Sequence, residues 1–307
     1  MLFRTILSDL SLNPVLGKED LLYNSLTRFL RDVRKTGVIL VDEDKEIIDR
    51  FFSAINHWHE LENFPQGSQC AIDLKKLLLI LQKENRLVFV SEKEHLESDC
   101  KTEFCLLYLD MAKTQNPEFI VVPDKCFECT SQSLSLLDTS KVLCIDSFDH
   151  DEAFRKYADR RGIEVQGWNQ YEFESKVLIP LFRCTENVFL LDRQFGKYFV
   201  SNSGYKATIK WILEVFMRTS NPFSRGVFEI HTKKVDDQNI IKEFEKNMQS
   251  LHPRFRVVFD SHNKHDRFLL TDQVKLGIGQ GFDLLVDSNK PYPCALRDTS
   301  ISYFDIP

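Results

Sequence analysis

The chain has 307 residues, of which 43% are hydrophobic and 28% charged, which is typical of globular proteins and excludes a disordered or fibrous chain. Its net charge of −6 has the wrong sign for a protein that coats nucleic acid, so such a substrate would have to lie in a local cleft. Eight cysteines without a secretory signal indicate reduced thiols and a cytoplasmic protein. No apolar run approaches membrane-spanning length, and the chain is long enough for two domains.

Short apolar runs alternate with helical patterns through the first half. Strands are predicted at residues 3–7, 37–41, 86–90, 119–122 and 141–145. Their lack of alternation between apolar and polar positions is typical of strands buried on both faces of a parallel sheet. Helices are predicted between them, at residues 18–34, 43–60, 71–84 and 101–114. This order predicts a doubly wound α/β domain over residues 1–150.

A highly charged stretch follows, and we predict a linker or linker helix over residues 151–185. A second α/β unit is predicted over residues 186–307. Its strands are expected at NVFLLD, GVFEIHT, RFRVVFD and SISYFDI, with amphipathic helices between the first three and a β-hairpin before the last.

Acidic side chains recur where the strands of the first half end. They are Asp9, the run from Asp42 to Asp44 with Glu46, Asp99 with Glu103, and Asp124. The carboxyl ends of parallel strands share one edge of a sheet, where ligands bind. Carboxylates crowded there would repel one another unless Mg²⁺ or Mn²⁺ neutralised them. The alternative is that each carboxylate caps the helix that follows it.

This layout resembles the PIN-domain nucleases over about residues 1–150. The matching residues are Asp9 in ILSDLSLN, Glu46 in VDEDKEII, Asp99 and Glu103 in ESDCKTEFCLLYLDMA, and Asp124 in FIVVPDKCF. Asp44 would serve nearly as well as Glu46. The resemblance implies that these five residues are catalytic and that Asp9, Asp99 and Asp124 hold the metal.

The run HDRFLLTDQVKLGIGQG, residues 265–281, carries a second pattern. Phospholipase-D-type enzymes use His-x-Lys-x4-Asp-x6-Gly-Ser-x-Asn, in which the His attacks phosphorus, the Lys holds phosphate oxygens and the Asp orients or stabilises the His. The residues at these positions here are His265, Arg267, Asp272, Gly279, Gln280 and Phe282. Arginine can still hold phosphate, but the Ser and Asn are lost.

A closer resemblance is to the phospholipase-D-like domain found C-terminal to microtubule-interacting-and-trafficking domains, and to its prokaryotic relatives. The phrases HDR, IGQGFD, VFEIHT, LLDRQFG and SISYFDI carry it over residues 186–307. It implies the fold and, in the eukaryotic proteins, binding of lipid head groups without cleavage. Catalysis by His265 and Asp272 would require a homodimer. The alternatives are a purely structural hairpin or phosphate binding by His231, Lys233, Lys264 and Arg267.

Three functions are therefore in competition. The one we favour is a metal-dependent nuclease acting on RNA or DNA, by analogy part of a prokaryotic antiphage defence or toxin system and working with a partner protein from the same operon. The second is a non-catalytic module that docks phosphate, lipid head groups or proteins. The third is a dimeric phosphodiesterase that uses His265.

Overall fold

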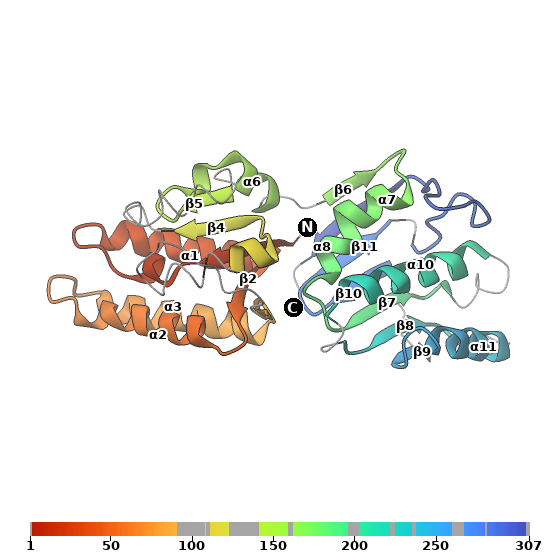
Figure 1. The fold of residues 1–307 in the computed structure, drawn as a ribbon, viewed down its shortest axis with the longest axis horizontal. Helices are drawn as coiled ribbons and strands as arrows, with labels where there is room; N and C mark the ends of the chain where they lie inside the picture. The colour runs from red at the N-terminus through yellow and green to blue at the C-terminus, as the bar shows by residue number, and fades with distance from the viewer. Residues whose placement is uncertain are drawn as a thin grey trace. The chain divides into compact units, whose positions relative to one another are not determined.

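The computed structural model describes residues 2–90, 108, 111–122, 141–158, 162–195, 203–221, 225–234, 238–259, 267–279 and 281–304. The chain divides into two compact units, Leu2–Asp159 and Arg160–Pro307 (Figure 1). Each unit has its own sheet with helices between its strands, which confirms the α/β class. Among the described helices, none combines the length and the apolar character needed to cross a bilayer.

The first unit is built on five parallel strands in the order β3-β2-β1-β4-β5. They are β1 (Phe3–Leu7), β2 (Gly37–Asp42), β3 (Leu87–Val90), β4 (Phe119–Val122) and β5 (Val142–Cys144). Each lies within one residue of its predicted bounds. The strands β2 and β4 are buried along their whole length, which explains the missing alternation in the sequence. The direction in which strands are added reverses between β1 and β4.

The helices of this unit are α1 (Glu19–Thr36), α2 (Glu46–Asn56), α3 (Gly67–Lys83) and α6 (Glu152–Ala158), with short helical turns η1 (Asp9–Leu12), η2 (His57–Glu60) and η5 (Phe148–His150). The first three match predicted helices, with shifted ends. Most of the helix predicted at 101–114 lies outside the described residues.

The core of the first unit contains a cluster of phenylalanine rings centred on Phe154 of α6. Its ring centroid lies between 5.1 and 6.0 Å from those of four others, Phe3, Phe29, Phe119 and Phe148. The helix α6 therefore packs against β1, β4 and α1. It is part of the first unit, although it was predicted to lie in the linker.

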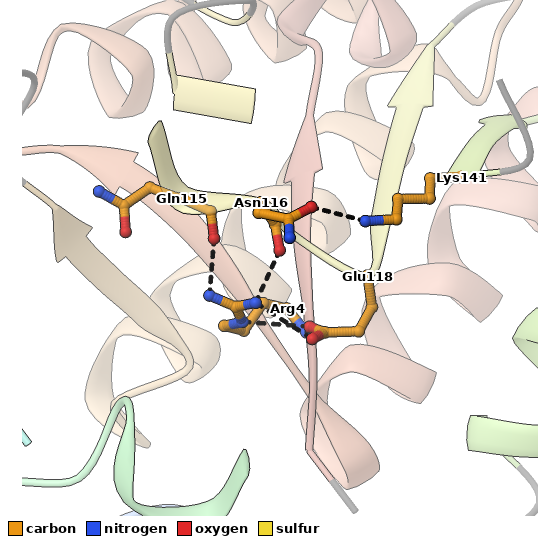
Figure 2. A network of polar contacts seen from close by, with 5 residues as sticks. All are labelled: Arg4, Gln115, Asn116, Glu118 and Lys141. Atoms are coloured by element: carbon orange, nitrogen blue, oxygen red, sulfur yellow. Dashed lines mark hydrogen bonds and ion pairs between the residues drawn. The ribbon is translucent and has the colours of Figure 1, made fainter. Parts of the chain in front are cut away.

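Arg4, near the amino end of β1, binds the segment that leads into β4 (Figure 2). Its Nε and Nη2 each donate to the carboxylate of Glu118 at 3.1 Å, and its guanidinium also donates to the carbonyls of Gln115 at 2.8 Å and Asn116 at 2.7 Å. Lys141, just before β5, donates to the side-chain oxygen of Asn116 at 2.6 Å. This network stabilises the edge of the sheet at which β1 begins.

The second unit contains a mixed sheet in the order β6-β12-β11-β10-β7-β8-β9. Its parallel strands are β7 (Val188–Asp192), β8 (Phe228–Thr232) and β9 (Phe255–Phe259), and its antiparallel ones are β10 (Arg267–Thr271), β11 (Lys275–Ile278), β12 (Thr299–Phe304) and β6 (Gly162–Val165). The helices α10 (Ser203–Thr219) and α11 (Gln238–Gln249) connect the parallel strands. They pack on one face, where Phe216 meets Phe228 and Phe244 meets Phe255, each pair at 5.9 Å between ring centroids.

The segment predicted as a linker is folded on both sides of the unit boundary. After α6, the strand β6 pairs with β12 at the edge of the second sheet, and the helical turns α7 (Gln170–Phe173), η6 (Glu174–Leu178) and α8 (Ile179–Phe182) follow. In β6, Ile163 and Val165 are buried whereas Gly162 and Glu164 are exposed. An edge strand covered on one face has few apolar residues, so its sequence resembles that of a linker.

Candidate functional site

Asp9 lies two residues after the end of β1, at the point where the strand order of the first sheet reverses. In open α/β sheets, ligands bind in the crevice outside such a point. Asp9 starts the turn η1 and is only 5% exposed. The acidic residue expected at this edge of the sheet, Asp9, is therefore a buried carboxylate.

Tyr108 fixes the orientation of Asp9. The tyrosine hydroxyl donates to Oδ1 of Asp9 at 3.0 Å and accepts from the Asp9 backbone N–H at 3.2 Å. Burial raises the pKa of Asp9, while the Tyr108 hydroxyl and the Arg50 guanidinium oppose that rise. Burial and the neighbouring carboxylate raise the pKa of Tyr108, so its hydroxyl keeps its proton and remains a donor.

The carboxylates that follow β2 have different roles. Asp42 caps α2, because its two oxygens accept from the backbone N–H groups of Glu46 and Ile47, each at 2.8 Å. This is the capping alternative. Glu46 is paired with Arg50 on the same helix, and its side chain is 55% exposed. The charge of Arg50 also lowers the pKa of Asp9, against the larger effect of burial.

The remaining predicted ligands of the first unit, Asp99, Glu103 and Asp124, lie outside the described residues. Within the described ranges, no group of three His, Cys, Asp or Glu side chains is placed to hold a metal ion. Among the predicted metal ligands, Asp9 is the one whose described surroundings can be compared with what a metal ion requires. It offers carboxylate oxygens, which Mg²⁺ and Mn²⁺ prefer, in a buried setting that disfavours an uncompensated charge.

A second buried carboxylate lies at the carboxyl end of β7. Asp192 is 1% exposed and is the register partner of Arg267 on β10. Its Oδ1 lies 3.9 Å from Nε of Arg267 and accepts from the backbone N–H of Gln194 at 2.8 Å. Burial raises the pKa of Asp192, against the effects of Gln194 and Arg267. Burial, followed by the charge of Asp192, also raises the pKa of Tyr205 on α10.

Gly281, which follows β11, packs against this pair. Gly281 has a φ of +74°, and a Cβ there would lie 2.5 Å from Cδ of Arg267 and 3.0 Å from Oδ2 of Asp192. Only glycine combines this backbone conformation with so close an approach. Gly281, in the phrase IGQGFD, therefore has a packing role in this structure.

Asp272 lies at the other end of β10 from Arg267. Its carboxylate accepts from the backbone N–H groups of Glu186 at 2.7 Å and Asn187 at 2.8 Å, and from the side-chain amide of Asn187 at 2.9 Å. The five residues of β10 span about 13 Å. Asp272 therefore fixes the loop before β7, and its predicted role beside His265 stays a prediction, because His265 lies outside the described residues.

His231 points to the opposite face of the sheet from Arg267. The register pairs His231 with Leu191, whereas Arg267 is paired with the next residue, Asp192, and neighbouring side chains in a strand alternate between faces. The two residues predicted to bind phosphate, His231 and Arg267, therefore lie on opposite faces of the sheet. Lys233 follows β8 and is exposed, and Lys264 and His265 lie outside the described residues.

Comparisons with known proteins give little to set beside this geometry. The sequence matches no family model and no curated protein. One similar solved structure is that of TrmBL2, described as an archaeal chromatin protein that shows a novel mode of DNA binding. It is 11% identical, the match covers 83% of this chain and 86% of that one, and the TM-score is 0.25. At that TM-score, no conclusion about this chain follows from the likeness.

Proposed function

We propose that the chain is a metal-dependent nuclease whose first unit cleaves phosphodiester bonds. The main support is Asp9, a buried carboxylate at the reversal point of a parallel sheet. Its raised pKa means that the ionised form is disfavoured where it stands, and a cation would stabilise that form. Asp99 and Asp124 follow β3 and β4 in the sequence, so they are the partners we propose for Asp9 in holding Mg²⁺ or Mn²⁺.

The side chains around Asp9 suit this chemistry. Tyr108 holds the carboxylate in one orientation, and Arg50 brings a positive charge that can attract a phosphate group. The chemistry that Mg²⁺ or Mn²⁺ supplies in such sites is polarisation of a phosphoryl oxygen and activation of water. The resemblance of residues 1–150 to PIN-domain nucleases agrees with this assignment. A role in prokaryotic defence or as a toxin, with a partner protein, remains an analogy.

The test is cleavage of labelled RNA and DNA by the purified chain with Mn²⁺ or Mg²⁺, with and without EDTA. Asp9→Asn keeps an oxygen that can accept from Tyr108 but removes the charge, so we expect a folded protein that no longer cleaves. Glu62→Gln, an exposed carboxylate in the turn before α3, is the matched control and should cleave normally. Full activity of Asp9→Asn, or activity that resists EDTA, would contradict the proposal.

The alternatives for the second unit have distinct signatures. A dimeric phosphodiesterase predicts cleavage that survives EDTA and is lost in His265→Ala. A phosphate-docking module predicts no cleavage and weaker binding in Arg267→Ala. The contact of Arg267 with buried Asp192 and the packing of Gly281 against both favour a structural role for this part of the motif.

A further inference from the structure

The sheet of the second unit has two unlike faces. Buried and half-buried residues alternate along β7 and β8, so one face is covered and the other is partly open. The strand registers align two rows of side chains across six strands of the partly open face. The first row is Phe304, Lys275, Leu270, Phe189, Glu229 and Arg256, and the second is Ser302, Gly277, Phe268, Leu191, His231 and Val258. We call these two rows the aromatic face.

One half of the aromatic face is a cluster of rings with a cation. Phe304 is 47% exposed, and its ring centroid lies 5.7 Å from that of Phe268. Nζ of Lys275 lies 3.9 Å from the centroid of Phe268 and 5.9 Å from that of Phe304. Gly277 makes room for this arrangement, since a Cβ there would lie 2.8 Å from Cε2 of Phe304.

The other half of the aromatic face also combines aromatic rings with a cation. The ring of Phe189 packs edge-on against that of His231 at 6.1 Å, and Glu229 lies 3.1 Å from His231 and 3.9 Å from Arg256. The Arg256 side chain is 62% exposed. The two rows therefore carry two permanent cations, Lys275 near one end and Arg256 at the other, and one carboxylate, Glu229, which lies beside Arg256.

We infer that the aromatic face binds single-stranded nucleic acid and holds the substrate of the proposed nuclease. Aromatic rings on a sheet stack with unpaired bases, and cations beside them attract the phosphates. A duplex fits less well because its bases are already stacked inside the helix. A protein partner or a second copy of the chain would have to bury Lys275 and Glu229, and lysine and glutamate are depleted in such interfaces.

The statement that the bound strand is then cleaved rests on the proposed function, but binding itself can be measured without cleavage. The probe is a fluorescein-labelled single strand of about 12 nucleotides, within the usual site size, titrated with the whole chain in EDTA and followed by fluorescence anisotropy. Phe304→Ala should weaken binding about fivefold or more by removing a stacking surface. Lys275→Gln should reduce the slope of log K against log salt by about 0.7, the value for one phosphate contact on a single strand.

Matched controls come from α7 and the turn after it. Lys176 lies 4.4 Å from the centroid of the Trp168 ring, so Lys176→Gln removes a similar cation–π pair away from the aromatic face. Tyr171→Ala removes an exposed ring from α7. Both should bind like the unaltered chain, and thermal melting should show that all four variants are folded.

Three results would overturn the inference. The first is unchanged binding in Phe304→Ala and Lys275→Gln, and the second is tighter binding of a duplex than of a single strand. The third is that the unaltered chain uses Phe304 to bind a vesicle or a second copy of itself and does not bind the oligonucleotide. Failure of the two proposals can be told apart. Binding without any metal-dependent cleavage would refute the nuclease alone, and cleavage that is indifferent to Phe304 and Lys275 would refute only the aromatic face. We expect Asp9→Asn to abolish cleavage and leave binding intact.

Discussion

Replacement of Phe154 by alanine tests whether α6 belongs to the core of the first unit. The side chain is 1% exposed, and its ring meets four other phenylalanine rings, so little can collapse into the space it leaves. Phe→Ala changes in cores cost about 3–5 kcal/mol, and the aromatic contacts favour the upper part of that range. A loss of 3 kcal/mol raises the unfolding equilibrium constant more than 100-fold.

Hydrogen exchange followed by mass spectrometry can resolve this loss by unit. In Phe154→Ala, peptides from β1, α1 and β4 should exchange at least about 100-fold faster where they exchange by global unfolding, and peptides from the second unit should be unchanged. Lys156→Ala, an exposed position on the same helix, should change stability by no more than about 0.5 kcal/mol. Equal effects of the two substitutions would show that α6 is peripheral and that our assignment of it to the core is incorrect.

Three further predictions concern single features. Burial, together with the charges of Arg225 and Arg254, lowers the pKa of buried His252 below its ordinary value of 6.5. The unfolded state therefore binds a proton more readily, so the second unit should lose stability as the pH falls below about 6.5. His252→Gln should remove this loss and flatten the plot of melting temperature against pH. Gly281→Ala should cost about 1–3 kcal/mol in urea unfolding, because it adds strain at positive φ and displaces Arg267; no loss would mean that the loop adapts freely. Arg4→Ala should cost about 1–3 kcal/mol in the same assay, and Arg4→Lys should recover only part because lysine lacks the fork.

The fold of the first unit could be predicted because β2 and β4 are buried along their whole length and all five strands are visible as apolar runs. The same reasoning failed at β6, whose only buried residues are Ile163 and Val165. Whether such a short segment is a strand depends on its partner β12, which lies more than a hundred residues away and leaves no local signal.

The candidate site could be predicted only in part. Asp9 was expected at the sheet edge because it follows an apolar strand. Tyr108 and Arg50 were not identified, because their relation to Asp9 arises from packing between separate segments. Motif spacing grouped Arg267 with Asp272, and His231 was added as a possible second histidine, but a sequence pattern does not show which end of a strand or which face of a sheet a side chain occupies.

The pairing of β6 with β12 joins the earliest and the latest strands of the second unit. Thr299 is the register partner of Val165, so the edge of this sheet cannot form on the ribosome until nearly the whole chain has been synthesised. A chain that stops before residue 299 would leave both β6 and β11 with an unpaired edge, which is a template for aggregation. Expression of the second unit by itself therefore has to start ahead of Gly162 and continue through Phe304.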